Sequence, residues 1–584
     1  MKPKISTTKS VKLKLSNYLP FLDWLHNYHK EYLVGDIMAG VIVAIMLIPQ
    51  AMAYALLAGL PPQVGLYASI LPPIIYALFG TSRALAVGPV AMVSLLVATG
   101  VGEFAQPNTP QYLIYAIVLA FLVGILQTFM GLVRLGFLVN FLSHAVISGF
   151  TSAAALIISL SQLKHLLGIN LPQTESFYQL LESIIQNLSQ TNLISLGIGL
   201  SSIALLLCFN KPLDNFLKSR QLAPTLITPI TRSGSLLVVL ASTLLVWILQ
   251  LEQTANIKIV GEIPAGLPPV TFPNFDLTIW QKLLPIALTI SFVGFMESIA
   301  VAKSLASKRR QKIDANQELI GLGTANLGAA FTGGYPVTGG FSRSVVNFTA
   351  GANTGLASII TALLIGLVVL FFTPLFYFLP KTALAAIIMV AVFGLVDVAT
   401  FKQMWRYNKA DALSLLVTFF AVLIAGIETG IIIGIITSIV LYLWRTSRPH
   451  MAVVGRVGDS EHFRNILRYD VKTYPHVIAI RVDESLYFAN TNYLEEHLIK
   501  LVNEQPDVEH LILICSGINF IDASALETLE NLIEGLKESG ISFYLAEVKG
   551  PVMDNLLRVG FVDKLGTNHI FLSTHQAMRA LGCC

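Results

Sequence analysis

Two stretches of this sequence decide its fold: TSRALAVGPVA at residues 81–91 and GGYPVTGGFSRS at residues 333–344. Each places glycine and proline inside an apolar run, and each run is the third in a group of seven. Because seven is odd, the second group crosses a membrane in the opposite sense to the first. Paired breaks at equivalent positions of inverted repeats are typical of a membrane transporter that binds its substrate near the bilayer midplane.

Apolar runs extend on both sides of these breaks, from about residue 35 to residue 444. The 584-residue chain is 54% hydrophobic and 12% charged, about half the charged share of a soluble domain, which excludes an ordinary soluble enzyme. A membrane-spanning helix needs about 20 apolar residues. We therefore predict an α-helical polytopic membrane protein with fourteen spans in a seven-plus-seven inverted repeat, near residues 37–58, 64–79, 84–100, 111–131, 137–160, 193–209, 235–250, 283–302, 316–333, 338–350, 355–374, 380–395, 411–425 and 429–444.

The basic residues predict the orientation of these spans. Residues 210–233 and 303–312, which follow the sixth and eighth spans, are rich in lysine and arginine, whereas residues 166–192 and 251–281 are not. The positive-inside rule then places both termini in the cytoplasm, and we expect a bacterial inner membrane. The net charge of +4 is too balanced for a protein that binds nucleic acid.

The composition changes after residue 447. Short β-rich runs alternate with helical runs at 492–504, 523–539 and 551–559, which is typical of a compact α/β domain. The β-rich runs are Val477–Val482, Leu486–Ala489, His510–Cys515 and Ile541–Ala546. The predicted division is a cytoplasmic amino-terminal segment, a first repeat, an extracytoplasmic loop, an inverted second repeat, and a linker with a cytoplasmic α/β domain, at residues 1–34, 35–250, 251–281, 282–447 and 448–584.

The two breaks favour an anion as the ligand. Helices that start there, with Pro89 in the first turn of one, direct two amino ends at one cavity, each worth about half a positive charge. Arg343 adds a full charge, and Ser342 and Ser344 offer hydroxyl donors. Together these groups suit a divalent oxyanion. The alternative is that the glycines only allow close helix packing and that Arg343 extends to the membrane interface.

Glu297 is the other ionisable residue inside a predicted span. A lone carboxylate in hydrocarbon costs about 2.5–3.5 kcal/mol, so it should face a cavity or hold a proton. We interpret it as a protonatable coupling site. The alternative is an ion pair with Arg343 or Lys303, which would occupy the arginine that the anion needs. Asp36, at the start of the first span, is interpreted as an interfacial residue at a helix end.

Five motifs of this chain resemble those of the sulfate permease family, which is solute carrier family 26 in animals: PQAMAYA at 49–55, GLYAS at 65–69, GTSR at 80–83, VGP at 87–89 and FSRS at 341–344. The resemblance extends over about residues 20–580. It implies a uracil-permease-like fold with core and gate parts, and a carboxy-terminal STAS domain at the α/β segment. It also implies a homodimer and an elevator-like movement of the core.

The resemblance also implies the residues of the anion site. In this sequence they are Gln50, Tyr54, Val90, Ala91, Gly340, Phe341, Ser342 and Arg343. Some relatives carry a serine at the position of Gly340 and an aromatic residue at that of Val90. We therefore expect a roomier and less apolar site in this chain.

The coupling ion also follows from the resemblance. Glu297 matches a glutamate linked to proton coupling in plant-type sulfate symporters. Sodium-driven bicarbonate relatives have aspartate there and threonines at the positions of Val301 and Phe341. Because two oxygen ligands are missing here, we favour protons over Na⁺.

The resemblance predicts a secondary active transporter of sulfate or a similar inorganic oxyanion, with the anion bound between the starts of the third and tenth spans. The first alternative is bicarbonate uptake or chloride–anion exchange on the same fold. Two further alternatives are an anion channel and a signalling protein that acts through its STAS domain. No nucleophile–base set, metal-ligand cluster or phosphate loop stands out, so we expect no enzyme, cofactor or metal. In the STAS loop, Asp522 is interpreted as a helix N-cap, in preference to a phosphorylation switch at Ser524.

Overall fold

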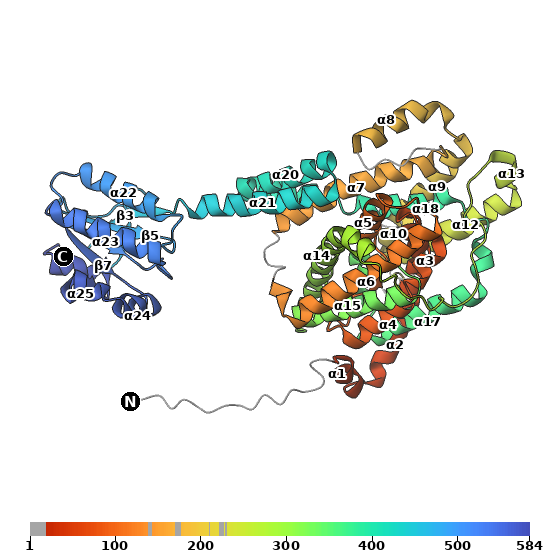
Figure 1. Cartoon of the computed structure of the whole chain (residues 1–584), viewed down its shortest axis with the longest axis horizontal. Coiled ribbons are helices and arrows are strands. Elements are labelled where there is room, and N and C mark those ends of the chain that lie inside the picture. The colour runs from red at the N-terminus through yellow and green to blue at the C-terminus, as the bar shows by residue number, and fades with distance from the viewer. Residues whose placement is uncertain are drawn as a thin grey trace. The chain divides into compact units, whose positions relative to one another are not determined.

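The computed structural model describes residues 19–137, 143–169, 177–209, 211–220, 227 and 230–583. Residues 1–18 of the predicted amino-terminal segment lie outside the described residues. The chain forms two compact units, Met1–Ile435 and Ile436–Cys584 (Figure 1). Each unit is described by itself below.

The first unit is helical, and its helices pack in two groups. In the core group, α15 packs on α6 and α4, α14 packs on α6 and α5, and α16 and α17 pack on α2. The bounds in this group are α2 Lys30–Leu57, α3 Pro62–Tyr67, α4 Leu71–Phe79, α5 Ala91–Gly102, α6 Pro110–Leu132, α14 Leu277–Lys308, α15 Ala315–Phe331, α16 Phe341–Thr349 and α17 Leu356–Phe371.

The gate group is built around α7 and α9. Helices α18 and α20 pack on α7, and α12 and α18 pack on α9. The bounds in this group are α7 His144–Leu166, α8 Phe177–Asn187, α9 Leu193–Phe209, α10 Lys211–Ser219, α12 Gly234–Ile248, α13 Leu251–Ala255, α18 Lys381–Phe393, α19 Val398–Tyr407 and α20 Lys409–Ala425. The boundary between the two units falls within α21, Ile427–Thr446.

Every predicted span overlaps a helix of the structure. Among the described residues, eight helical segments are long and apolar enough to cross a membrane, and α5, α12 and α17 are shorter apolar helices. The two broken spans contain short helices because a strand occupies the first part of each. The number of fourteen spans stays a prediction.

These strands, β1 (Val87–Gly88) and β2 (Thr338–Gly339), pair antiparallel with each other. Val87 lies opposite Gly339, and Gly88 lies opposite Thr338. The sequence analysis did not predict this pairing, because two residues per strand leave no periodic pattern to read. The pairing joins the two breaks and sets the starts of α5 and α16 beside each other.

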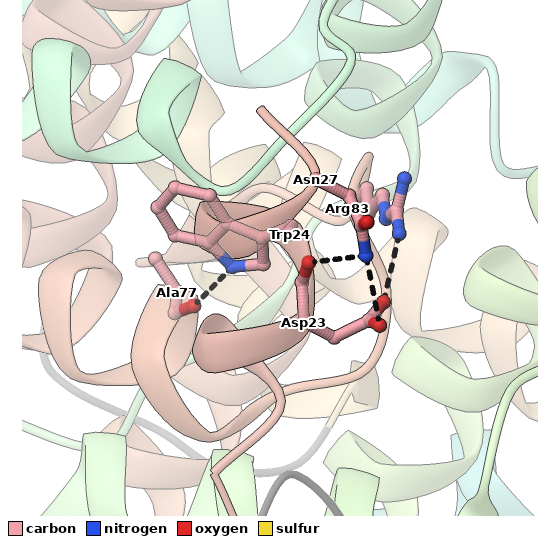
Figure 2. Close-up of polar contacts among 5 residues, drawn as sticks. All are labelled: Asp23, Trp24, Asn27, Ala77 and Arg83. Carbon is pink, nitrogen blue, oxygen red and sulfur yellow. Dashed lines mark hydrogen bonds and ion pairs between the residues drawn. The ribbon is translucent and has the colours of Figure 1, made fainter. Parts of the chain in front are cut away.

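A short helix, α1 (Phe21–His26), is fixed to the segment between α4 and β1 (Figure 2). The Trp24 indole nitrogen donates to the carbonyl of Ala77 at 3.4 Å. Arg83 pairs with Asp23 at 3.2 Å, and the Asn27 amide donates to the Asp23 carbonyl at 2.9 Å. The arginine of the GTSR motif therefore anchors α1 and takes no part in the predicted anion site.

Two fully buried carboxylates fix core-group loops. Glu318 of α15 accepts hydrogen bonds from the Thr81 hydroxyl and from the backbone of residues 81 and 82. Asp36 accepts from the amides of Asn353 and Thr354 and from the Thr354 hydroxyl. Asp36 is 0% exposed and lies inside α2, so the prediction of an interfacial helix-end residue was wrong. Its donors come from a loop more than 300 residues away, which local sequence does not reveal.

The second unit contains a six-stranded sheet in the order β4-β3-β5-β6-β7-β8. Strands β5 to β8 are parallel, and β3 pairs antiparallel with β5. The strands are β3 Met451–Arg456, β4 Phe463–Asn465, β5 Val477–Val482, β6 His510–Ile514, β7 Ser542–Ala546 and β8 Ile570–Phe571. The helices are α22 Thr491–Asn503, α23 Ala523–Glu538, α24 Gly550–Arg558, α25 Phe561–Leu565 and α26 Thr574–Ala580.

The α/β prediction for this unit was largely confirmed. The predicted strand at Leu486–Ala489 was wrong, because Leu486 makes only an isolated bridge to Ile521. The N-cap interpretation of Asp522 is confirmed, since its side chain accepts from the Ala525 amide at 2.8 Å. Ser524 is exposed in the first turn of α23, and its phosphorylation stays untested.

Candidate functional site

A cavity of about 420 Å³ lies between the core group and the gate group. The residues that the resemblance assigned to the anion site, together with Glu297, all line this one cavity. They are Gln50 and Tyr54 of α2, Val90 and Ala91 at the start of α5, Glu297 of α14, and Gly340, Phe341, Ser342 and Arg343 at the start of α16. The structure therefore brings together residues from four segments spread over nearly 300 positions.

The amino ends of two half-helices meet at this cavity. Val90 is the N-cap of α5 and Gly340 is the N-cap of α16, and neither end has a side-chain cap. Uncapped first-turn N–H groups concentrate positive potential, which suits an anion. Helix α5 begins at Ala91, so the prediction that Pro89 occupies its first turn was wrong: Pro89 and Val90 still belong to the extended segment after β1.

Polar contacts behind the cavity hold β2 in place. The Ser298 and Thr338 hydroxyls lie 2.7 Å apart, and the Gly339 amide donates to the Ser298 hydroxyl at 2.8 Å. Ser298 follows Glu297 in α14, so the helix that carries the carboxylate also anchors the second break. The positions of Glu297 and of the start of α16 are thereby linked.

Arg343 is the centre of the site. Its side chain is only 2% exposed, and Nη1 donates to the carbonyl of Pro89 at 2.7 Å. Its Nε and Nη2 atoms are buried without a hydrogen-bond partner. Arg343 from the second break thus reaches the first break with one nitrogen and keeps two for a ligand. Buried donors without partners are costly, so an acceptor in this cavity would stabilise them.

Gly340 allows this placement of Arg343. A Cβ atom at Gly340 would lie 2.9 Å from both Cζ and Nη2 of Arg343, which is too close. Gly88, in the other break, has φ +155°, a conformation that glycine adopts readily, and a Cβ atom there would lie 3.4 Å from Nη2 of Arg343. The Arg343 guanidinium therefore occupies the space beside Gly340, and the expectation of a roomier, less apolar site than in relatives stays a prediction.

The two predicted serine donors differ in the structure. Ser342 is exposed and lines the cavity. Ser344 is buried, donates to the Gly340 carbonyl at 2.7 Å, and accepts from the Ala86 amide at 2.9 Å. The Ser344 hydroxyl therefore ties the two breaks together, and the prediction that it is a ligand donor was wrong.

Glu297 makes no hydrogen bond or ion pair with any residue that the structure describes, and its Oε2 atom is buried. It also lines a second cavity of about 200 Å³, whose other neighbours include Phe150, Val301 and Phe341. The carboxylate therefore lies between the polar cavity and an apolar one. The alternative of a structural ion pair with Arg343 or Lys303 finds no support in this geometry.

The sequence analysis missed the gate side of the cavity. Thr231, Arg232 and Ser235 line it at and just before the start of α12, and Phe209 lines it from the end of α9. Arg232 had been used only to predict orientation. A cation directly before an apolar span is the one signal in the sequence that could have indicated it.

The fold and the cavity define a class of protein. Paired half-helices, a buried guanidinium and a carboxylate meet between two helix groups of the first unit, an arrangement that is typical of secondary transporters. The chain belongs to the sulfate permease family, whose model matches residues 33–418. The STAS domain model matches residues 468–577.

Plant sulfate transporters are among the similar proteins. "Sulfate transporter 4.1, chloroplastic" of Arabidopsis thaliana is 39% identical over 98% of this chain and 84% of its own length. "High affinity sulfate transporter 2" of Stylosanthes hamata is 32% identical over 99% of this chain and 88% of its own length. The relatives are transporters, so the chain is an anion transporter of a membrane and not an enzyme.

Solved structures have the same fold. Murine solute carrier 26 family member A9, in an inward-facing state, has a TM-score of 0.89 at 26% identity and covers 100% of this chain and 97% of its own. The transmembrane domain of a cyanobacterial bicarbonate transporter has a TM-score of 0.58 at 23% identity and covers 70% of this chain and 98% of its own. The predicted fold class, a helical membrane transporter with a STAS domain, is confirmed.

Proposed function

We propose that this protein takes up sulfate or a similar inorganic oxyanion together with protons, and that the anion binds between the amino ends of α5 and α16. The observation that carries the proposal is Arg343, whose Nε and Nη2 are buried without partners beside these two helix ends. Oxyanions suit such a site because a guanidinium can donate two parallel hydrogen bonds to them. Gln50 and Tyr54 would contribute further donors from α2.

Glu297 is the proposed proton carrier. Its carboxylate lines the same cavity as Arg343 and accepts no hydrogen bond from the described residues. A proton on Glu297 removes the cost of an unpartnered charge and stops it from repelling the anion. Bringing two negative charges in against 100 mV, inside negative, costs about 4.6 kcal/mol. One proton offsets half of this, so further protons or a pH gradient must supply the rest.

The surroundings of Glu297 favour a proton over Na⁺. Of the side chains around the apolar second cavity, only Glu297 and Thr151 carry oxygen. Val301 and Phe341, at the positions of the missing threonines, both line it. A hard cation needs several oxygen ligands, whereas a proton needs only the carboxylate.

The transport cycle that we propose is an elevator movement of the core group past the gate group, in a homodimer. The anion site belongs to the core group and the rest of the cavity wall to the gate group, so relative movement would change its access. The relative with a TM-score of 0.89 is described as inward-facing, and we propose that state here. From the distribution of basic residues we also propose that both termini lie in the cytoplasm. The named relatives are plant proteins, and a bacterial inner membrane stays a prediction for this chain.

The test is uptake of radiolabelled sulfate into proteoliposomes under an inward proton gradient. We expect accumulation that a protonophore abolishes. Bicarbonate added as an unlabelled competitor examines the alternative, bicarbonate uptake or chloride–anion exchange. No sulfate uptake by folded protein, with bicarbonate or chloride still carried, would refute the proposal and support that alternative.

Arg343 provides the matched variant. Arg343→Ala should lower sulfate affinity at least about 100-fold, since hydrogen bonds to a charged group are worth about 1.5–3 kcal/mol each. Arg220→Ala is the control, because Arg220 is exposed and lies over the Phe216 ring outside the cavity. Equal affinities in the two variants would place the anion elsewhere.

A further inference from the structure

Arg232 is a second arginine that lines the cavity, and it comes from the gate group. It lies two residues before α12 in the gate group, and it lines the cavity together with Thr231 and Ser235. Its side chain is half-buried. Arg343 belongs to the core group, so the cavity has one guanidinium on each of its two walls.

Arg232 has no hydrogen bond, ion pair or ring contact within the described part of the chain. The other half-buried arginines that the structure describes are all engaged. Arg83 pairs with Asp23, Arg481 pairs with Asp483, Arg309 lies over the Phe348 ring, and Arg456 donates to the carbonyls of Asp459 and Ser460. A half-buried guanidinium without an acidic partner is stabilised by an anion that enters the cavity.

The charges of the cavity can be counted. Besides the phenol of Tyr54, the ionisable side chains that line it are Arg232, Glu297 and Arg343. With Glu297 ionised, their net charge is +1, and with Glu297 protonated it is +2. The first suits a monovalent anion and the second a divalent one. Without Arg232 the protonated cavity would carry only +1.

We propose that Arg232 is a specificity-determining residue that makes this cavity favour divalent over monovalent anions. The inference rests on the proposed function of the cavity. Coulomb energy is proportional to the product of the charges. Removing one positive charge from the cavity therefore costs a divalent anion twice as much binding free energy as a monovalent anion. A tenfold loss for sulfate then corresponds to about a threefold loss for bicarbonate or chloride.

The experiment measures two constants in proteoliposomes: the KM for sulfate and the inhibition constant of bicarbonate against sulfate uptake. For Arg232→Gln we expect the KM to rise about tenfold and the inhibition constant about threefold. Arg232→Lys keeps the charge and should keep the ratio of the two constants near that of the wild type. Arg220→Gln, an arginine outside the cavity, should change neither.

Two results would overturn the inference. One is an equal shift of both constants in Arg232→Gln, which indicates a change of shape and not of charge. The other is a ratio that changes as much in Arg232→Lys as in Arg232→Gln. If Arg343→Ala lowers sulfate affinity while Arg232→Gln leaves both constants unchanged, only this inference fails. If the wild type carries no sulfate, the proposed function fails with it.

Discussion

Two carboxylates of the core group, Glu318 and Glu297, lie in neighbouring helices with opposite surroundings. Glu318 is 0% exposed, and its oxygens accept four hydrogen bonds at 2.6–3.0 Å, from Tyr76, from Thr81 twice and from Ser82. Glu297 is half-buried and accepts none from the described residues, and its Oε2 is buried without a partner. A buried charge with every acceptor site used is structural, whereas one left without partners is available for chemistry.

The largest loss of stability should follow the removal of the Glu318 carboxylate, which is fully hydrogen-bonded. Glu318→Ala leaves the buried donors of Tyr76 and Ser82 and the half-buried donors of Thr81 without their acceptor. An unsatisfied buried donor costs about 1–3 kcal/mol, so we expect a loss of stability above about 3 kcal/mol. Thermal unfolding in detergent measures it. Glu297→Ala is the matched variant and should unfold near the wild-type temperature. Equal destabilisation of the two variants would remove the distinction between them.

The unpartnered carboxylate should affect coupling and leave the fold intact. Glu297→Gln removes the proton site and keeps the shape, so we expect anion exchange to continue while uphill accumulation no longer follows the proton gradient. Sulfate uptake with and without an imposed pH gradient measures this. Glu103→Gln, an exposed residue just beyond the end of α5, is the control. Uphill accumulation by Glu297→Gln that still tracks pH would disprove the coupling role.

A smaller effect should come from a single donor to Glu318. Tyr76→Phe removes the hydroxyl that donates to Oε2 at 2.7 Å, and a hydrogen bond to a charged group contributes about 1.5–3 kcal/mol. We expect a lower unfolding temperature with an unchanged KM for sulfate. If the KM changed more than the stability, the region around Glu318 would belong to the transport site.

The smallest effect should come from a neutral hydrogen bond near the anion site. The hydroxyls of Tyr335 and Ser94 lie 2.9 Å apart and join the approach to β2 with α5. Tyr335→Phe should cost about 1 kcal/mol of stability and change the KM for sulfate less than twofold. A large loss of affinity would mean that this contact sets the position of α5 at the cavity.

The contrast between carboxylates with and without hydrogen-bond partners also explains which site residues could be predicted from the sequence. Arg343 and Glu297 stand out because a charge inside an apolar span has few structural explanations. Asp36 and Glu318 were misread or missed, because their donors lie more than 230 residues away and leave no local pattern. Ser342 and Ser344 look equivalent in the sequence, but α16 turns Ser344 inward to join the two breaks.

The sequence by itself determined the class of fold, because apolar length, positive-inside asymmetry and interrupted spans reflect the cost of placing polar groups in a bilayer. The matching breaks indicated where the site lies, and the family resemblance supplied its core-group residues. Only the tertiary structure decided which polar side chains have hydrogen-bond partners. It decided the pairing of β1 with β2, the free nitrogens of Arg343 and the placement of Arg232. These features depend on contacts between distant segments, and such contacts produce no periodic pattern in a single sequence.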